Sequence, residues 1–253
     1  MPCILEAHRG VGTEYPENTL PAFRAAYAQH YGMCELDTKF TRDGACVILH
    51  DSTLNRMARN ADGSELAEPV KIEDITLAEA RAYDFGLSKG EQFRGTKICT
   101  LDEVLAFSAE TGMKLKFDNV LQSHNGGQMK VFILTLLNSP ALPNCGFTTA
   151  SLCFAAYLHN IFPENAIHYD GVVDEAHLKS LSGIVPKELL TIWIRFDNDR
   201  TAWCKNPPVT EERAALIHRY GSMGVWLLDK PEELKRAEHF GAALAETDGS
   251  LKP

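Results

Sequence analysis

The sequence contains no apolar run that approaches the roughly 20 residues of a membrane-spanning helix. It also contains no internal repeats, low-complexity tracts or linker-like segments. The first residues, MPCILEAHRG, lack the basic segment and the long apolar segment of a secretory signal peptide. We therefore expect a protein without a membrane span or a signal peptide.

Paired cysteine motifs are also absent. The seven cysteines are odd in number, and no two of them form a C-x-x-C pair. This argues against a disulfide framework and against a zinc knuckle. It favours a reducing compartment, and we expect a cytoplasmic protein.

Positive charge is scarce, since 25 lysines and arginines face 34 acidic residues and the formal net charge is −9. Nonspecific binding of nucleic acid requires a cationic surface, so this class of function is disfavoured. An anionic small molecule stays compatible with the charge if a metal ion and a few cations lie at the site. We expect a small-molecule partner, and the sequence leaves the oligomeric state open.

Short apolar runs typical of strands alternate with amphipathic helical stretches along all 253 residues. Strands are predicted at 3–8, 33–38, 114–119, 145–150, 166–171, 189–196, 223–228 and 242–247. Helices are predicted at 19–31, 101–112, 128–138, 151–160, 174–182, 210–220 and 231–240. The fold class is therefore α/β, and eight such units favour a (β/α)8 TIM barrel, with a doubly wound open sheet as the competing architecture.

One interval breaks this alternation. About 75 residues separate the second and third strands, and they include a predicted hairpin strand at 45–50. We interpret residues 1–253 as one domain, with 51–98 as a small insertion after the second strand, on the catalytic face.

The stretch CELDTKF places Glu35 and Asp37 two positions apart on a predicted buried strand. Side chains alternate along a strand, so both carboxylates point to the same face and repel each other. For an isolated E-x-D pattern, ion pairs or turn caps would be the commoner explanation. Here, however, other polar residues are predicted at neighbouring strand ends.

Those residues are His8-Arg9, His50-Asp51 and Asp118. In a barrel, the carboxyl ends of the strands form the active face. Three carboxylates there, from Glu35, Asp37 and Asp118, make an oxygen-ligand site for a hard divalent cation, Mg²⁺ or Ca²⁺. Such a cation would offset the repulsion between the acids.

Five short motifs follow one another along the chain: HRG (8–10), PENT (16–19), E-x-D (35–37), T-x-D-G (41–44) and HD-x-x-L-x-R (50–56). A later stretch, GVWLLDKPEELKRAEHFGAALAETD, adds a tryptophan and a terminal T-D. In order and spacing these motifs resemble the glycerophosphodiester phosphodiesterase family. The resemblance covers most of the chain and is sharpest over residues 7–56.

The resemblance implies a (β/α)8 barrel enzyme, a phosphoric diester hydrolase that binds one divalent cation, Mg²⁺ or Ca²⁺, with Mn²⁺ as a further candidate. It implies that His8 and His50 serve as acid and base and that Arg9 contacts the phosphate. It also implies that Glu35, Asp37 and Asp118 ligate the metal. Glu17 of PENT is expected beside the site, where it would orient Arg9; the alternative is an acid that favours a helix N-terminus.

The third ligand departs from the family pattern. The family usually shows E-x-K on the third barrel strand, whereas this chain has Asp118-Asn119-Val120. Lys116 lies on the same strand face as Asp118 but deeper in the barrel, and it is a candidate substitute for the missing lysine in substrate binding. Trp226 is a candidate for stacking on the alcohol portion of a substrate.

The expected reaction releases glycerol 3-phosphate and an alcohol such as choline or ethanolamine. Water could attack directly, or a substrate hydroxyl could attack and give a cyclic phosphate. Two alternatives therefore stay open: a phospholipase D-like lyase and a non-catalytic binding protein on the same barrel.

We expect Arg200, Trp203 and Lys205, in the long segment after the sixth strand, to select the headgroup. His124 follows the third strand, and we expect no catalytic role for it.

Overall fold

The computed structural model describes residues 3–253 and has a closed barrel of eight parallel strands at its centre. The barrel strands are β1 (Ile4–Ala7), β2 (Met33–Leu36), β6 (Lys114–Phe117), β7 (Cys145–Thr149), β8 (Ala166–Tyr169), β9 (Leu190–Arg195), β10 (Ser222–Trp226) and β11 (Leu244–Thr247). Their order is β1-β11-β10-β9-β8-β7-β6-β2, and β2 pairs with β1 to close the barrel. The predicted (β/α)8 barrel is confirmed, and the competing open sheet is wrong.

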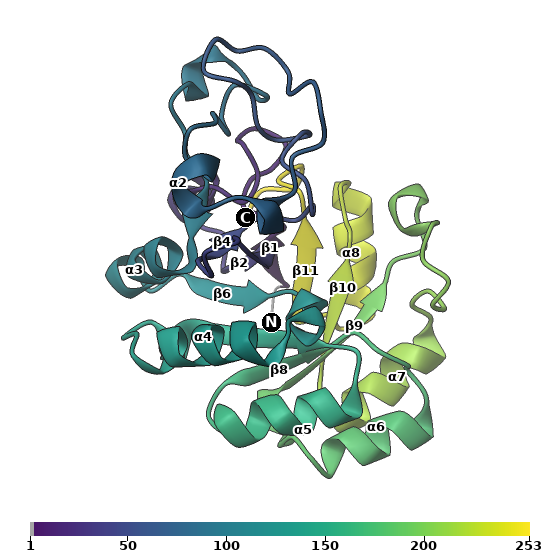
Figure 1. Ribbon diagram of the computed structural model, residues 1–253. Coiled ribbons are helices and arrows are strands. Elements are labelled where there is room, and N and C mark those ends of the chain that lie inside the picture. Colours follow the sequence, from purple (N-terminus) through teal and green to yellow (C-terminus); the bar gives the residue numbers. More distant parts are fainter. Residues whose placement is uncertain (1–2) are drawn as a thin grey trace.

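Helices connect the strands and cover the outside of the barrel (Figure 1). They are α1 (Leu20–Ala28), α3 (Leu101–Thr111), α4 (Gly126–Leu137), α5 (Leu152–Ile161), α6 (Glu175–Ser182), α7 (Glu211–Tyr220) and α8 (Pro231–His239). Local signals explain where several begin. The Thr100 side chain accepts from the backbone N–H of Glu103 in a capping box, and Thr210 caps α7. Among the described residues, no helix is long and apolar enough to cross a membrane.

The interval between β2 and β6 forms a small antiparallel sheet of β3 (Thr38–Phe40), β4 (Cys46–Ile48) and β5 (Cys99–Thr100), followed along the chain by α3. The segment between β4 and β5 contains the short helix α2 (Leu77–Ala80) and is drawn in dark blue at the top of Figure 1. It packs around a hydrophobic cluster separate from that of the barrel: Val47, Leu49, Leu54, Met57, Ala58, Ile72, Ala80, Phe85 and Ile98. The predicted strand at 45–50 contains β4, whereas β3 and β5 were not predicted.

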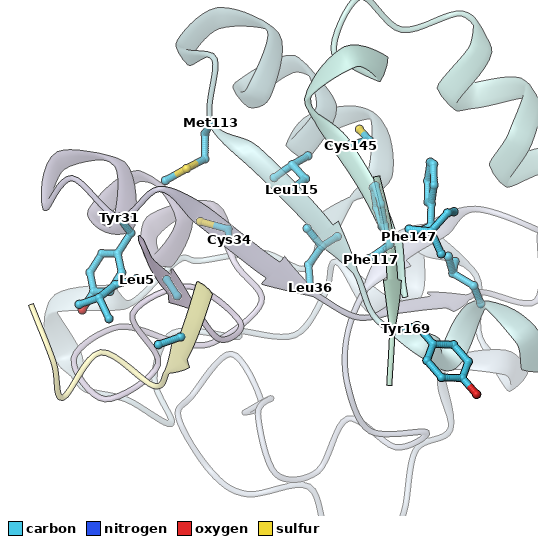
Figure 2. Close-up of a cluster of buried hydrophobic side chains, with 14 of the residues drawn as sticks. Leu5, Tyr31, Cys34, Leu36, Met113, Leu115, Phe117, Cys145, Phe147 and Tyr169 are labelled. Carbon is cyan, nitrogen blue, oxygen red and sulfur yellow. The ribbon is translucent and has the colours of Figure 1, made fainter. Parts of the chain in front are cut away.

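The apolar faces of the barrel strands pack outward against the helices. Figure 2 shows part of this core, including Leu36, Phe117 and Phe147. The Phe117 ring lies edge-on to Phe132 of α4 with 5.1 Å between ring centroids, and Phe147 stacks on Phe162 at 4.6 Å. Because side chains alternate along a strand, this outward packing directs the neighbouring residues into the barrel.

The inside of the barrel is polar and charged beneath the carboxyl ends of the strands, where many barrels hold layers of branched aliphatic residues. Glu6, Lys116 and Glu246 are buried there, together with the indole of Trp193. Gly224 makes room for that indole, since a Cβ at this position would lie 2.5 Å from the ring of Trp193. The polar interior leads directly to the mouth of the barrel, where the candidate site lies.

Candidate active site

A cavity of about 380 Å³ opens at the carboxyl ends of the barrel strands. Its lining comprises His8, Arg9, Glu35, Asp37, His50, Lys116, Asp118, Asn119, Thr148, Asp170, Trp193, Trp203, Trp226, Leu227 and Glu246. Of the residues predicted for catalysis, metal binding and substrate contact, Glu17 is missing from this lining, as are Arg200 and Lys205 of the segment expected to select the headgroup. A larger hollow of about 640 Å³ lies on the outer surface between α3 and α4, and it contains no histidine or cation.

The three predicted metal ligands meet at the floor of the cavity. Glu35, Asp37 and Asp118 each offer one carboxylate oxygen, and these oxygens all lie within 4.8 Å of one another. Glu35 and Asp37 are only 2% and 3% exposed. Burial, followed by the charge of Asp37, raises the pKa of Glu35 well above its usual value. Oxygen donors in this arrangement fit a hard divalent cation such as Mg²⁺ or Ca²⁺.

Groups from the β1–α1 loop partly compensate the repulsion between Glu35 and Asp37. The backbone N–H of Arg9 donates to Glu35 at 3.0 Å, and Asn18 donates to Asp37 at 2.9 Å. Arg9 adopts a left-handed conformation with φ of 55°. Gly10 follows with φ of 83°, and a Cβ there would meet the Cβ of Ala22 at 2.7 Å. The local structure therefore explains the HRG motif, because its turn directs the backbone amide and the guanidinium of Arg9 at the acids.

Arg9 and Glu17 form an ion pair beside the acid cluster. The Arg9 Nη1 donates to Glu17 Oε1 at 3.0 Å, and Arg9 Nε lies 3.4 Å from Asp37 Oδ2. Glu17 precedes Thr19, the N-cap residue of α1, and it faces Arg9. Burial alone would lower the pKa of Arg9, but the neighbouring acids raise this pKa above its ordinary value. The guanidinium is thus held as a cation at the edge of the cavity.

Each of the two predicted acid–base histidines pairs with an aspartate through Nδ1. His8 Nδ1 lies 2.5 Å from Asp248 Oδ1, and His50 Nδ1 lies 2.6 Å from Asp51 Oδ1. The imidazoles differ in exposure, since 17% of the His8 side chain and 45% of the His50 side chain is accessible. Burial lowers the pKa of His8. In both pairs an Nδ1–H donated to the carboxylate would leave Nε2 free for proton transfer.

Lys116 is enclosed by other groups of the barrel interior. Its Nζ lies 2.5 Å from Glu6 Oε1 and 2.6 Å from Glu246 Oε2, and 3.7 Å from the ring centroid of Trp193. Burial outweighs the attraction of Lys116 and raises the pKa of Glu6 to about 8, whereas Lys116 outweighs burial and lowers that of Glu246 to about 2. Lys116 therefore pairs with the acids of the barrel interior and also lines the cavity, and its contact with substrate stays a prediction.

Four site residues were not singled out from the sequence: Glu6, Asp170, Trp193 and Glu246. Asp248, the partner of His8, entered only as the last residue of the terminal T-D. Glu6 pairs in register with Glu246 on the adjacent strand β11. A signal for both was available, because each is an acid in an otherwise apolar strand, two positions before a polar strand end. Both acids lie in the layer beneath the strand ends, at the level of Lys116.

The long segment after β9 reaches the cavity through one of its three predicted residues. The Trp203 ring lies 5.7 Å from the Trp226 ring, and both line the cavity. Arg200 pairs with Asp248 and Asp229 instead, and Lys205 is exposed outside the lining. His124 also lies outside the lining; its Nε2 is 2.8 Å from Thr38 Oγ1.

Asp170 gives the metal-free protein an expected pH dependence. Burial, followed by the charge of Asp118, raises the pKa of Asp170 from 3.8 to about 6. A raised carboxyl pKa means that the folded state binds the proton more tightly than the unfolded state. The stabilising contribution is therefore complete below pH 3.8 and is lost as the pH rises through about 6.

We expect Asp170→Asn to raise the Tm of the EDTA-treated protein at pH 7 by about 2 °C or more, and to leave it unchanged near pH 3.5. Thermal unfolding followed by circular dichroism measures this. Asp174→Asn is the matched control, and its Tm change at pH 7 should have the opposite sign. Hydrogen bonds from His177 lower the pKa of Asp174, so the ionised carboxylate stabilises the fold there. An equal Tm for wild type and Asp170→Asn at pH 7 would contradict the prediction.

Comparison with known proteins places this geometry in a family. The sequence profile of the Glycerophosphoryl diester phosphodiesterase family matches residues 8–138, which include both histidines and all three clustered acids. A glycerophosphodiester phosphodiesterase of Caldanaerobacter subterraneus subsp. tengcongensis is 38% identical over 104 residues, which are 41% of this chain and 40% of that protein. Glycerophosphodiester phosphodiesterase 1 of Bos taurus is 34% identical over 114 residues, 44% of this chain and 32% of that protein. These alignments span well under half the length of the curated relatives.

Solved structures extend the likeness to the whole fold. An Oleispira antarctica phosphodiesterase, solved in complex with the product sn-glycerol-3-phosphate, superposes with a TM-score of 0.77 at 20% identity, covering 98% of this chain and 93% of that one. A glycerophosphoryl diester phosphodiesterase from Parabacteroides distasonis gives a TM-score of 0.74 at 18% identity, covering 98% and 83%. At these identities the two structures support the fold alone. The profile match spans more than half of the chain, and the chain therefore belongs to the glycerophosphoryl diester phosphodiesterase family.

Proposed function

We propose that this chain is a metal-dependent phosphodiesterase that hydrolyses glycerophosphodiesters to glycerol 3-phosphate and an alcohol. The observation that carries the proposal is the convergence of two His–Asp pairs and one arginine on a cavity floored by three clustered acids. The names of the curated relatives support the same reaction class.

The acids Glu35, Asp37 and Asp118 would hold one divalent cation, Mg²⁺, Ca²⁺ or Mn²⁺. When bound, such an ion neutralises phosphoryl oxygens and the charge that develops on them in the transition state. Arg9 carries the second positive charge at the same end of the cavity. Its guanidinium is oriented by Glu17, so that it is directed towards the acid floor where the phosphoryl group would lie.

His8 and His50 would divide the proton transfers. Burial lowers the pKa of His8, so its neutral form is favoured at pH 7 and it suits the role of general base. His50 then protonates the leaving alkoxide, with Asp51 stabilising the charged imidazolium. Each aspartate would hold Nδ1 of its imidazole and leave Nε2 for proton transfer, as in other carboxylate–histidine pairs.

The alcohol portion would lie on the tryptophan side of the cavity. A second cavity of about 250 Å³ shares Asp170, Trp193 and Trp226 with the first and is otherwise walled in part by Val172, Val173, Ile194 and Pro207. Aromatic faces and aliphatic walls suit an alcohol with an apolar body or a methylated ammonium group.

Trp203→Ala is expected to raise KM by about two- to fivefold for glycerophosphocholine, because a cation over an exposed aromatic ring such as that of Trp203 contributes about 0.5–1 kcal/mol. Glycerophosphoglycerol, which has no cation, should be affected much less. Lys205→Ala is the control from the same segment, since Lys205 lies outside the cavity. Steady-state kinetics on both substrates measures the difference, and an identical KM change for the two would contradict the assignment.

Phosphorus NMR of reaction mixtures tests the proposed function. A panel of glycerophosphodiesters and sugar phosphodiesters would be incubated with Mg²⁺, Mn²⁺ or Ca²⁺, with and without EDTA. Hydrolysis predicts glycerol 3-phosphate as the metal-dependent product. Accumulation of a cyclic phosphate would instead indicate a phospholipase D-like lyase, and ligand binding without turnover would indicate a binding protein.

The cytoplasmic location expected from the cysteines remains part of this proposal. All seven cysteines are free thiols in the structure, and four of them are buried. A fluorescent fusion imaged in the native cell, with a thiol-alkylation assay on the extracted protein, tests location and redox state together.

A further inference from the structure

Arg56 lies in the segment that follows β4, six positions after His50, and it contacts two acids at once. Its Nε donates to Asp51 Oδ2 at 2.7 Å. On the other side, Nη2 donates to Glu17 Oε1 at 2.7 Å and Nη1 to Glu17 Oε2 at 2.9 Å. The guanidinium thus uses its planar fork to join two carboxylates that are far apart in the sequence.

Each of these acids holds one member of the proposed catalytic group. Asp51 contacts Nδ1 of His50 at 2.6 Å, and Glu17 accepts from Nη1 of Arg9 at 3.0 Å. A continuous chain of contacts therefore runs from His50 through Asp51, Arg56 and Glu17 to Arg9. Arg56 itself is absent from the cavity lining, so it acts on the site only through its neighbours.

His50 has particular need of such support. It follows β4, which belongs to the small antiparallel sheet and not to the barrel. Its ring contacts only the carboxylate of the next residue among the hydrogen bonds of the described chain, and nearly half of the side chain is exposed. The other catalytic groups, in contrast, extend from barrel strands or from the β1–α1 loop.

The two acids in this series of contacts, Asp51 and Glu17, stay ionised near neutral pH. Burial alone would raise the pKa of Asp51, but hydrogen bonds from Arg56 and His50 lower this pKa to about 2. The pKa of Glu17 is also lowered against the effect of burial, by Arg56 and Arg9. Both acids therefore remain carboxylates over the pH range in which histidines titrate.

We propose that Arg56 is a positioning residue that holds the His50–Asp51 pair and the Arg9–Glu17 pair in one fixed arrangement across the cavity. The inference rests on the proposed function for its kinetic consequence, but the arrangement itself can be measured without turnover. A second contact supports the same coupling, because Nζ of Lys89, also between β4 and β5, donates to the carbonyl oxygen of Gly12 at 2.6 Å. The segment between β4 and β5 thus holds the β1–α1 loop at two points.

Arg56→Ala is expected to lower kcat by about 10–100-fold, the usual effect of removing a group that orients a catalytic residue, with KM changed by less than about threefold. Arg56→Lys should recover only part of this loss, since one ammonium cannot reproduce the fork. Arg94→Ala is the matched control: Arg94 is 44% exposed against 46% for Arg56, and it makes a two-pronged pair with Glu91, neither residue lining the cavity.

Side-chain ¹H–¹⁵N NMR of the histidines gives a readout independent of activity. In the wild-type protein we expect His50 in a single tautomer protonated at Nδ1, and in Arg56→Ala a mixture of tautomers. Arg94→Ala should leave the His50 signals unchanged. A double-mutant cycle of Arg56→Ala with Glu17→Gln should be strongly non-additive in kcat, because both variants break the same chain of contacts.

Wild-type kcat in Arg56→Ala, or an equal loss in Arg94→Ala, would overturn the positioning role. Unchanged His50 signals in Arg56→Ala would also overturn it. If the wild-type protein cleaves no phosphodiester while the His50 tautomer still depends on Arg56, the proposed function fails and the positioning inference stands.

Discussion

Alanine in place of His8 or His50 is expected to lower kcat for glycerophosphodiester hydrolysis by about 10²–10⁴-fold, the range attributed to a positioned general acid or base. Each imidazole lines the cavity and is bonded at Nδ1 to an aspartate, so removing either leaves one of the two P–O bonds without proton transfer. Steady-state kinetics with a coupled assay for glycerol 3-phosphate measures the loss.

His177→Ala provides a matched control. Its Nδ1 pairs with Asp174 at 2.8 Å and its side chain is 42% exposed, much like His50 beside Asp51, but it lies on α6 and outside the cavity. It should keep the wild-type kcat. Full activity in His8→Ala or His50→Ala would refute the acid–base assignment. Two active histidines of different protonation state also predict a bell-shaped dependence of kcat/KM on pH.

The second large effect concerns the clustered acids. Asp37→Asn and Asp118→Asn are each expected to abolish measurable binding of Mg²⁺ or Mn²⁺ and to reduce activity to the level seen with EDTA, because each removes an anionic oxygen donor from the floor of the cavity. Isothermal titration calorimetry with each metal measures the affinity directly.

Glu246→Gln identifies which acids bind the ion. A second group of possible ligands, formed by His8, Glu35 and Glu246, shares Glu35 with the first. Glu246 is already bonded to Lys116 at 2.6 Å, so we expect Glu246→Gln to retain metal binding. Loss of metal in Glu246→Gln with retention in Asp37→Asn would reverse the assignment and place the ion beside His8.

The sequence predicted the fold in detail because the signals for a parallel barrel are local and repeated. Most barrel strands are short apolar runs, β6 alternates lysine with apolar residues, and helices such as α3 begin at a recognisable cap. The carboxyl ends of the strands also lie at one end of the barrel, so the proximity of His8, Asp37 and Asp118 could be predicted without knowledge of tertiary contacts. The small sheet was only partly predicted, because only one residue separates β3 from β2 and because β5 has only two residues.

Contacts across the barrel axis could not be predicted in the same way. Lys116 resembles a substrate ligand from its strand position, but its partners Glu6 and Glu246 come from strands more than 100 positions away. The link between Arg56 and Glu17 likewise depends on how the segment after β4 folds back over the β1–α1 loop. Such pairings depend on tertiary packing, which periodicity along one strand does not encode.

We propose that Glu35, Asp37 and Asp118 form the metal site at the mouth of the barrel. Anomalous diffraction from crystals soaked in Mn²⁺ tests it most directly, because the peak locates the ion without reference to activity. We predict one strong anomalous peak within coordination distance of a carboxylate oxygen from each of the three acids. A saturating soak that leaves this position without a peak, with the acids bonded only to protein, would contradict the account.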